Sequence, residues 1–317
     1  MIIAQDYAER KAKASVVQDK IFFYMTLGSA VLVVALLGAV IISLIIGAWP
    51  ALSTFGPAFL WTERWSPVKQ IFGALAPIYG TIISSVIAMI IGIPVSFGIA
   101  IFLTEVCPER LRRPIGIAVE LLAGIPSIIY GLWGFFVLAP FLQTTIQPFL
   151  IATLGHVPLI GFLFGGAPYG IGLLTAGIVL AIMVIPFITS VTRDVFETVP
   201  VLLRESAYGM GMTTWEVIRH IVIPYTRVGL VGGIMLGLGR ALGETMAVTF
   251  VIGNSHNISA SLLAPATTIS ATIANEFTEA TSGLYTSSLI AIGLVLFVIT
   301  FIVLGVAKWL IMGTENK

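Results

Sequence analysis

Six long runs of apolar residues restrict this 317-residue chain to one class of fold. A helix of roughly 20 apolar residues crosses the ~30 Å hydrocarbon core of a bilayer, and each run reaches that length. Only 10% of the residues are charged, whereas soluble domains average about a quarter. We therefore predict an all-α, polytopic membrane protein with six transmembrane helices. The predicted spans are Ile21–Ile46, Pro77–Leu103, Ile115–Phe141, Tyr169–Thr189, Val228–Ile252 and Ser287–Met312.

Three prolines, Pro94, Pro126 and Pro186, fall inside the second, third and fourth predicted spans. In lipid, neighbouring helices can satisfy the backbone groups that a proline frees, so a proline does not rule out a span. We interpret the three residues as kinks.

Lysine and arginine residues indicate the orientation, because they are retained on the cytoplasmic side of a membrane. The N-terminal segment holds four of them, the second loop three and the fourth loop four, whereas the alternate loops hold only Arg64 and Lys69. We expect both termini and the fourth loop to be cytoplasmic. On the other side, Trp49, Trp61 and Trp65 are expected to anchor the first external loop at the membrane interface.

The second external stretch, 253–287, is rich in hydroxyl groups and has Glu276 and Glu279 as its only acids. Two interpretations of it stay open. It forms either a short surface helix that meets a soluble partner or a connecting loop.

Composition and motifs argue against several function classes. A net charge of +1 argues against a nucleic-acid partner. Cys107 is the only cysteine and the three histidines are scattered, so we expect no intramolecular disulfide, no metal and no redox cofactor. The sequence contains neither a GxxxxGK[ST] nucleotide loop nor a nucleophile–base pair, so we expect no catalysis on this chain.

A polar segment, Glu205–Pro224, interrupts the apolar chain on the predicted cytoplasmic side, and we call it the docking segment. Glu205 suits a helix N-terminus, and Gly211 permits a turn between two short helices. Pro224 is expected to stop the second helix before the next span. Such a helix–turn–helix can sit in a groove of a partner protein. The alternative is a loop that folds back on the membrane.

The fifth predicted span carries two charged residues, Arg240 and Glu244. Arg240 is expected about 18 Å from the cytoplasmic end, near mid-membrane. A charge there costs roughly 2.5–3.5 kcal/mol and is a functional-site hypothesis by default. Glu244 lies one helical turn on and is expected to share the same face. The alternative is a structural ion pair, although the arginine precedes the glutamate, which is the less stabilising order.

Small residues recur at every fourth position along the same span, and their ridge is expected to straddle the face of the two charges. Such ridges let helix backbones approach closely, so we predict packing against another helix, in this subunit or in a partner. The charged pair would then lie beside a subunit seam or a pore. The ridge consists of Gly229, Gly233, Gly237 and Ala241.

The docking segment resembles the coupling-loop signature of ABC importer permeases, which reads Glu-Ala-Ala, three residues, Gly, nine residues, Ile, one residue, Leu-Pro. The runs RDVFETVP, ESAYGMG, GIPSIIYGLWG and GGIMLGLGRALGETMAV resemble the C-type permease subunit of the phosphate-specific ABC importer, over nearly the whole chain. The residues that match the signature are Glu205, Ala207, Gly211, Ile221 and Pro224, while Ser206 and Ile223 replace an alanine and a leucine.

The resemblance implies a type I ABC importer permease fold in a bacterial cytoplasmic (inner) membrane. It also implies an A-type phosphate permease subunit, two ATPase subunits and an external phosphate-binding protein as partners. ATP and Mg would be bound by the ATPase subunits, so this chain would be non-catalytic. The implied parts are a cytoplasmic N-terminal segment, 1–20; the first helix and external interfacial loop, 21–76; the transmembrane domain, 77–312, with its coupling loop, 193–224; and a cytoplasmic tail, 313–317.

On this basis Glu205, Ser206, Ala207, Gly211, Ile221 and Pro224 are expected to dock the ATPase. Arg240 and Glu244 are expected to line the substrate path. A guanidinium suits an oxyanion, because it is permanently charged and offers a planar fork of donors. Glu244 is expected to compete for Arg240 when the path is empty and to repel phosphate when it is full. Ser85, Ser127, Tyr130 and Thr245 are candidate further donors, although bonds to helix carbonyls are their more ordinary role.

Two alternatives to a phosphate importer remain at this point. One is a permease for another tetrahedral oxyanion, which the residues do not separate from phosphate. The other is a secondary anion transporter or channel that works without ATP. The docking segment argues against the second alternative, since a lone transporter has no reason to keep it.

Overall fold

The structure, a computed structural model, describes residues 2–158 and 160–315. In that part of the chain every regular element is a helix, and the only β-pairing is two isolated bridges. Six helical segments are long and apolar enough to span a membrane, which confirms the predicted fold class and number of spans. They are Gln18–Phe55, Leu75–Val106, Ser127–Leu154, Leu173–Glu197, Thr214–Gly243 and Gly283–Trp309.

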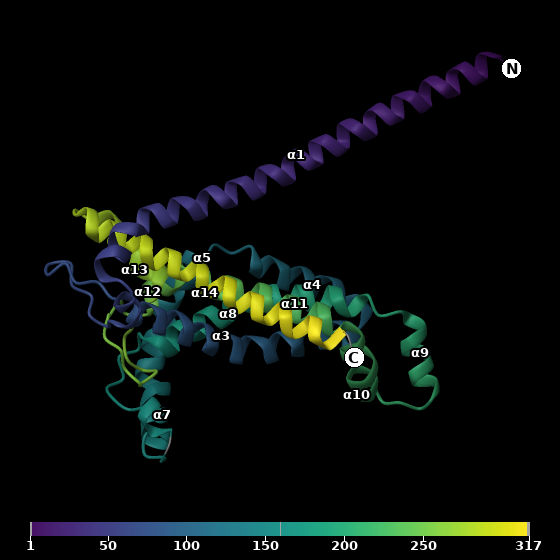
Figure 1. Ribbon diagram of the computed structural model, residues 1–317. Helices are drawn as coiled ribbons and strands as arrows, with labels where there is room; N and C mark the ends of the chain where they lie inside the picture. Colours follow the sequence, from purple (N-terminus) through teal and green to yellow (C-terminus); the bar gives the residue numbers. More distant parts are fainter. Residues whose placement is uncertain (1, 159, 316–317) are drawn as a thin grey trace.

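The long helices form a bundle whose ends carry the shorter elements (Figure 1). The long α-helices are α1 (Ile2–Phe55), α3 (Leu75–Ile101), α4 (Glu109–Ala123), α8 (Leu173–Glu197), α11 (Ile223–Gly243) and α14 (Gly283–Glu315). The short ones are α2 (Ala58–Trp61), α5 (Ser127–Trp133), α6 (Ala139–Phe141), α7 (Gln147–Leu154), α9 (Val201–Gly209), α10 (Thr214–Val217), α12 (Met246–Val251) and α13 (Ile269–Glu276). π-Helical turns occupy η1 (Phe102–Val106), η2 (Gly134–Leu138), η3 (Leu142–Ile146) and η5 (Ile218–Val222), and 3₁₀ turns occupy η4 (Gly161–Leu163) and η6 (Phe277–Glu279).

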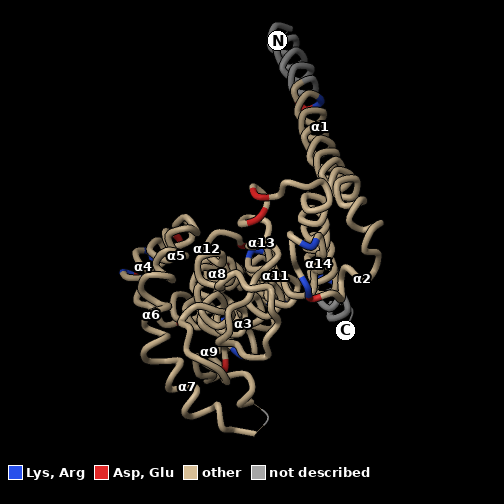
Figure 2. The backbone as a smooth tube through the Cα atoms, turned by 90° about the vertical axis from the view of Figure 1, so that its left-hand side faces the viewer, with Lys and Arg blue, Asp and Glu red and all other residues tan. Residues whose placement is uncertain are grey.

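Helix α8 is the centre of the bundle. In its most apolar stretch 61% of the residues are buried, against 33% or fewer in the other spans. Its main neighbours are α3 and α11, and α4, α5 and α12 also touch it. Most of the chain around this core carries no charge (Figure 2). A helix buried on so many sides needs apolar residues all round, which the sequence of α8 supplies.

The C-terminal part of helix α1 packs on the bundle, and the N-terminal part of the helix extends away from it (Figure 1). Ala48 and Ala51 are fully buried there. The backbone N–H of Ala51 donates a 2.9 Å hydrogen bond to Oγ of Ser287 on α14. The predicted first span, Ile21–Ile46, lies within this helix.

The third predicted span, Ile115–Phe141, is wrong as a single helix. Helix α4 ends at Ala123 and a new helical run begins at Ser127, with Pro126 as its N-cap instead of a kink within a helix. The cause is local, because Gly124 and Pro126 both favour a break and helices usually end before a proline. Pro94 and Pro186, in contrast, lie inside α3 and α8 as predicted.

The fourth and fifth predicted spans are shifted relative to the structure. The fourth begins at Leu173 and not at Tyr169, because Gly172, the residue before it, has a φ of 151° that no helix contains. The fifth is not one helix to Ile252, since α11 ends at Gly243 and α12 follows as a separate short helix.

A cluster of aromatic and charged side chains ties the segments at the predicted external end, and it corrects two expectations. Trp65 is 9% exposed, so it is not an interfacial anchor, whereas Trp49 and Trp61 are exposed. The indole N–H of Trp65 donates a 2.6 Å hydrogen bond to Oε2 of Glu276, at the end of α13. The second external stretch contains a short helix, α13, as one of the two interpretations expected, but the first half of this helix is buried. The predicted tail, 313–317, lies partly outside the described residues, and the proposed division into parts stays a prediction.

Candidate functional site

The docking segment folds as two short helices, α9 and α10, that project beyond the ends of α3, α8 and α11 (Figure 1). Gly211 lies in the turn between them with a φ of 88°, a conformation that side chains other than glycine rarely adopt. Thr213 then starts α10 with a capping box, in which its N–H donates a 2.8 Å hydrogen bond to Oε2 of Glu216. The predicted turn is therefore present, and local interactions define it on both sides.

Two residues of the docking segment have other positions than predicted. Glu205 is the fifth residue of α9, because the helix already starts after Pro200, so it does not lie at the helix N-terminus. Pro224 does not stop the second helix. The helical run continues from α10 through η5 into α11, and Pro224 lies inside it, just after the π-helical turn η5.

The docking segment divides into an anchored face and an exposed face. Ala207 is buried in a cluster with Ala100, Phe196 and Val222, and Ile221 packs against this cluster. Glu205, Ser206 and Gly211 are exposed. Several apolar side chains are also exposed on or next to this segment, which is the character of a protein-binding surface. They are Val201, Leu202, Met210 and Trp215.

An ion pair joins α9 to the end of the second span. Nη1 of Arg204 lies 2.7 Å from Oε1 of Glu105, whose side chain is only 5% exposed. The two groups meet at ion-pair distance without an aligned N–H···O bond, so the attraction is that of two charges. The sequence pattern alone did not single out Glu105. The available signal was a lone acid in the last turn of an apolar span.

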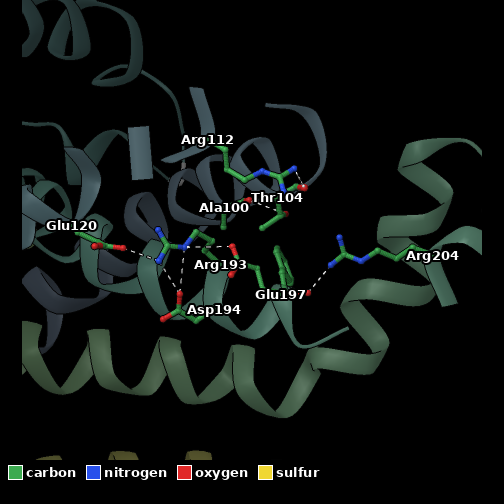
Figure 3. A network of polar contacts seen from close by, with 9 residues as sticks. Ala100, Thr104, Arg112, Glu120, Arg193, Asp194, Glu197 and Arg204 are labelled. Atoms are coloured by element: carbon green, nitrogen blue, oxygen red, sulfur yellow. Dashed lines mark hydrogen bonds and ion pairs between the residues drawn. The ribbon is translucent and has the colours of Figure 1, made fainter. Parts of the chain in front are cut away.

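Arginines from two further elements hold the same end of the bundle together (Figure 3). Nη2 of Arg193, on α8, donates a 2.7 Å hydrogen bond to Oε1 of Glu120 on α4 and a 2.9 Å bond to Asp194. Nη2 of Arg112 donates a 2.8 Å bond to the carbonyl of Thr104 in η1. The end of the bundle that carries the docking segment is thus tied by polar contacts, whereas its middle is apolar.

The membrane half of the site differs from the prediction in one respect. Helix α11 ends at Gly243, and Glu244 has an extended backbone with φ of −67° and ψ of 131°, so Arg240 and Glu244 do not share a helix face. A carboxylate oxygen of Glu244 accepts a 3.3 Å hydrogen bond from the N–H of Ala247 in α12. This local bond favours a new helix start over continuation of α11. Within the described part of the chain no ion pair joins the two residues.

Arg240 lies level with the middle of α8. Its guanidinium carbon is 4.5 Å from the ring centroid of Phe187, and Gly237, one turn earlier, packs on Ile188. Its Nε is buried without a hydrogen-bond partner. A cation over an aromatic face gains roughly 0.5–2 kcal/mol, which offsets only part of the ~2.5–3.5 kcal/mol that an arginine costs at mid-membrane. The arrangement leaves a cation that is not neutralised by Glu244.

The ridge of small residues packs against α8 of this same chain. A Cβ added to Gly229, Gly233 or Gly237 would come within 3.1 Å of Val195, Val191 or Ile188 respectively. Ala241 is buried in the cluster that contains Val184 and Ile188. The ridge therefore serves packing within the subunit, and it fixes the rotation of α11 that brings Arg240 over Phe187.

Of the four candidate hydroxyls, two make the ordinary bonds to helix carbonyls. The hydroxyl of Tyr130 donates a 2.8 Å bond to the carbonyl of Leu122, and that of Thr245 a 3.3 Å bond to the carbonyl of Gly243. Ser85 is buried with no partner for its hydroxyl. Ser127 is half-buried in the first turn of α5.

Together these features define a class of protein: a membrane-embedded transport subunit with an intramembrane cation and an exposed docking element. The comparisons then define the family. The chain belongs to the family of binding-protein-dependent transport system inner membrane components, whose model matches residues 92–314.

Curated relatives resemble the chain over almost its whole length. It is 67% identical to the phosphate transport system permease protein PstC of Mesorhizobium japonicum, over 94% of this chain and 91% of that protein. It is 59% identical to the protein of the same name from Pasteurella multocida, over 91% of this chain and 90% of that one.

Solved structures show the same fold at low sequence identity. A chain of a bacterial alginate ABC transporter, in complex with an alginate-bound periplasmic protein, matches with a TM-score of 0.60 and 17% identity, over 92% of this chain and 94% of that chain. A chain of the MetNI methionine ABC transporter in an inward-facing conformation matches with a TM-score of 0.55 and 16% identity, over 79% of this chain and 99% of that chain. The fold is therefore that of type I ABC importer permeases.

Proposed function

We propose that this chain is the transmembrane permease subunit of an ATP-driven importer that carries inorganic phosphate across the cytoplasmic membrane. The observation that carries the proposal is the cation at Arg240, in a chain whose relatives are named phosphate transport permeases. Arg240 lies in the last turn of α11 and has no carboxylate partner among the described residues. A charge at such a depth favours a counter-ion that comes and goes. A phosphate anion is such a counter-ion.

In this proposal Arg240 draws the anion into the bundle and binds it through the planar fork of its guanidinium. Phe187 holds the guanidinium from one side, which lowers the entropy that binding costs. Glu244 is bound to the start of α12 and does not pair with Arg240. Its expected role is therefore repulsion of the passing anion, and the competition for Arg240 that the sequence suggested has no support in this state.

The proposed partners are an A-type phosphate permease, two ATPase subunits and an external phosphate-binding protein. ATP and Mg would be bound on the ATPase subunits, which would dock on α9 and α10. The exposed apolar side chains of these two helices, among them Leu202 and Trp215, support this role. We also propose that the docking segment and both termini face the cytoplasm, on the evidence of the lysine and arginine distribution.

The test is transport by the purified complex in lipid vesicles. With ATP inside and binding protein outside, labelled phosphate should accumulate, and unlabelled phosphate should compete better than sulfate. Uptake that persists without ATP would instead show a secondary transporter. Stronger competition by another oxyanion would show that the substrate is not phosphate.

A further inference from the structure

The Glu105–Arg204 ion pair connects α9, the helix that leads into the docking segment, to the end of the second span. Glu105 lies in η1, the π-helical turn that ends the second span, and Arg204 lies on α9. The charged atoms are 2.7 Å apart, and the side chains are 5% and 18% exposed. Ion pairs this well buried are not of the exposed kind that contributes little.

Arg204 also binds the end of the central helix. Its Nη2 donates a 2.6 Å hydrogen bond to the carbonyl of Phe196, a fully buried residue in the last turn of α8. One guanidinium therefore bridges three elements, which are α9, the end of the α3 span and the end of α8. Apolar contacts through Ala207 and its neighbours also hold α9 in this region. Apolar contacts are non-directional, whereas a charge pair fixes position and orientation.

The two spans that Arg204 holds are among those that pack against α11, the helix of Arg240. Gly237 of α11 packs on Ile188 of α8. A Cβ placed on Gly237 would also lie 3.9 Å from the terminal methyl group of Met89 on α3. Helix α3 and helix α8 make the most extensive helix pair of the fold. Displacement of α9 thus acts on a closely packed pair of helices that reaches the level of Arg240, and packed cores transmit such strain.

We propose that Glu105 and Arg204 are positioning residues for energy coupling: they transmit movement of the docked ATPase from α9 to α3 and α8. The inference rests on the proposed function, since it requires an ATPase on the docking segment. It separates two roles within that segment. The exposed face binds the ATPase, and the Glu105–Arg204 pair links the bound segment to the spans.

The test compares Glu105→Gln, Arg204→Gln and the double variant in the complete complex in vesicles. The measured quantities are co-purification of the ATPase, the rate of ATP hydrolysis and the number of phosphate ions taken up per ATP. Glu120→Gln is the control, because its partner Arg193 also lies 2.7 Å away and is about as buried as Arg204, but neither residue belongs to α9. Arg204→Lys keeps the charge and should retain more uptake per ATP than Arg204→Gln.

If the pair couples, the double variant assembles and hydrolyses ATP but takes up about tenfold less phosphate per ATP, within the usual range of coupling between protein sites. The control should keep the parental ratio. A double variant with the parental ratio would overturn the proposal. Loss of the ATPase from the double variant would overturn it too, because the pair would then serve assembly alone. If the parental complex itself takes up no phosphate, this result refutes the proposed function and not the role of the Glu105–Arg204 pair in coupling.

Discussion

Replacement of Arg240 by glutamine separates a substrate-binding role from a structural one. Arg240 has no ion-pair partner among the described residues, so its removal leaves no orphaned carboxylate at Glu244. The change loses a cation–π contact with Phe187 worth roughly 0.5–2 kcal/mol. It also removes a charge that costs ~2.5–3.5 kcal/mol at mid-membrane. We therefore expect the subunit to insert and assemble at the parental level.

Phosphate transport by Arg240→Gln, unlike its insertion and assembly, should fall sharply. A guanidinium that binds phosphate through two charge-assisted hydrogen bonds, at about 1.5–3 kcal/mol each, contributes ~3 kcal/mol or more. This free energy corresponds to a loss of about 100-fold or more in transport at low phosphate concentration. Arg240→Lys should also be impaired, because a lysine keeps the charge but not the planar fork.

The assay is uptake of labelled phosphate in vesicles, with co-purification of the ATPase as the measure of assembly. The decisive variant is Arg240→Gln with Glu244→Gln. If Arg240 only neutralised Glu244, the double variant would regain what either single change loses, because an uncompensated buried charge is the main cost of a broken pair. Phosphate uptake near the parental level in that variant would refute the reasoning. Arg113→Gln, the same change at an exposed arginine, is the control.

Three further predictions concern the turn, the external cluster and the orientation. Gly211→Ala should strain the turn at a φ of 88° by about 1–2 kcal/mol and lower substrate-stimulated ATP hydrolysis, whereas Gly209→Ala, within α9, should not; equal rates would make the turn unimportant. Burial raises the pKa of Glu276, but hydrogen bonds from His256, Tyr285 and Trp65 outweigh it and hold this pKa below its usual value. The stabilisation is thus complete above the unfolded pKa of about 4.3 and is lost as the pH falls through the folded pKa, so acid should lower the melting temperature of the parent more than that of Glu276→Gln. A cysteine at Asn257, in a Cys107→Ser background, should react with an impermeant thiol reagent outside intact cells, and one at Thr214 should not; the reverse pattern would invert the orientation.

Hydropathy predicts the number of spans because each apolar run is long enough to be identified as a membrane-spanning helix without knowledge of its packing partners. It does not predict where helices stop, since local capping decides that point. The end of α11 at Gly243 depends on a bond from Ala247 to the carboxylate of Glu244, which apolar length ignores. The break between α4 and α5 depends on Gly124 and Pro126.

Long-range partners were also beyond the sequence. Trp65 looks interfacial in its own loop, and only the fold brings it to Glu276, 211 residues away. Glu105 gains its meaning in the same way, through Arg204 on α9. By contrast, the positions of Gly211 in a turn and of the small-residue ridge on a helix interface followed from the pattern alone, because backbone conformation and side-chain volume are local properties.

Helix α8 links the two halves of the proposed mechanism. Phe196, near its end, accepts the hydrogen bond from Arg204, and Phe187 holds the guanidinium of Arg240. These residues are separated by about 13 Å of helix at 1.5 Å per residue. Pro186, directly before Phe187, removes one backbone hydrogen bond and makes this the point where α8 bends most easily. A pull on the end of α8 would therefore concentrate its displacement where Phe187 meets Arg240, and so change the position of the cation on which phosphate binding is proposed to depend.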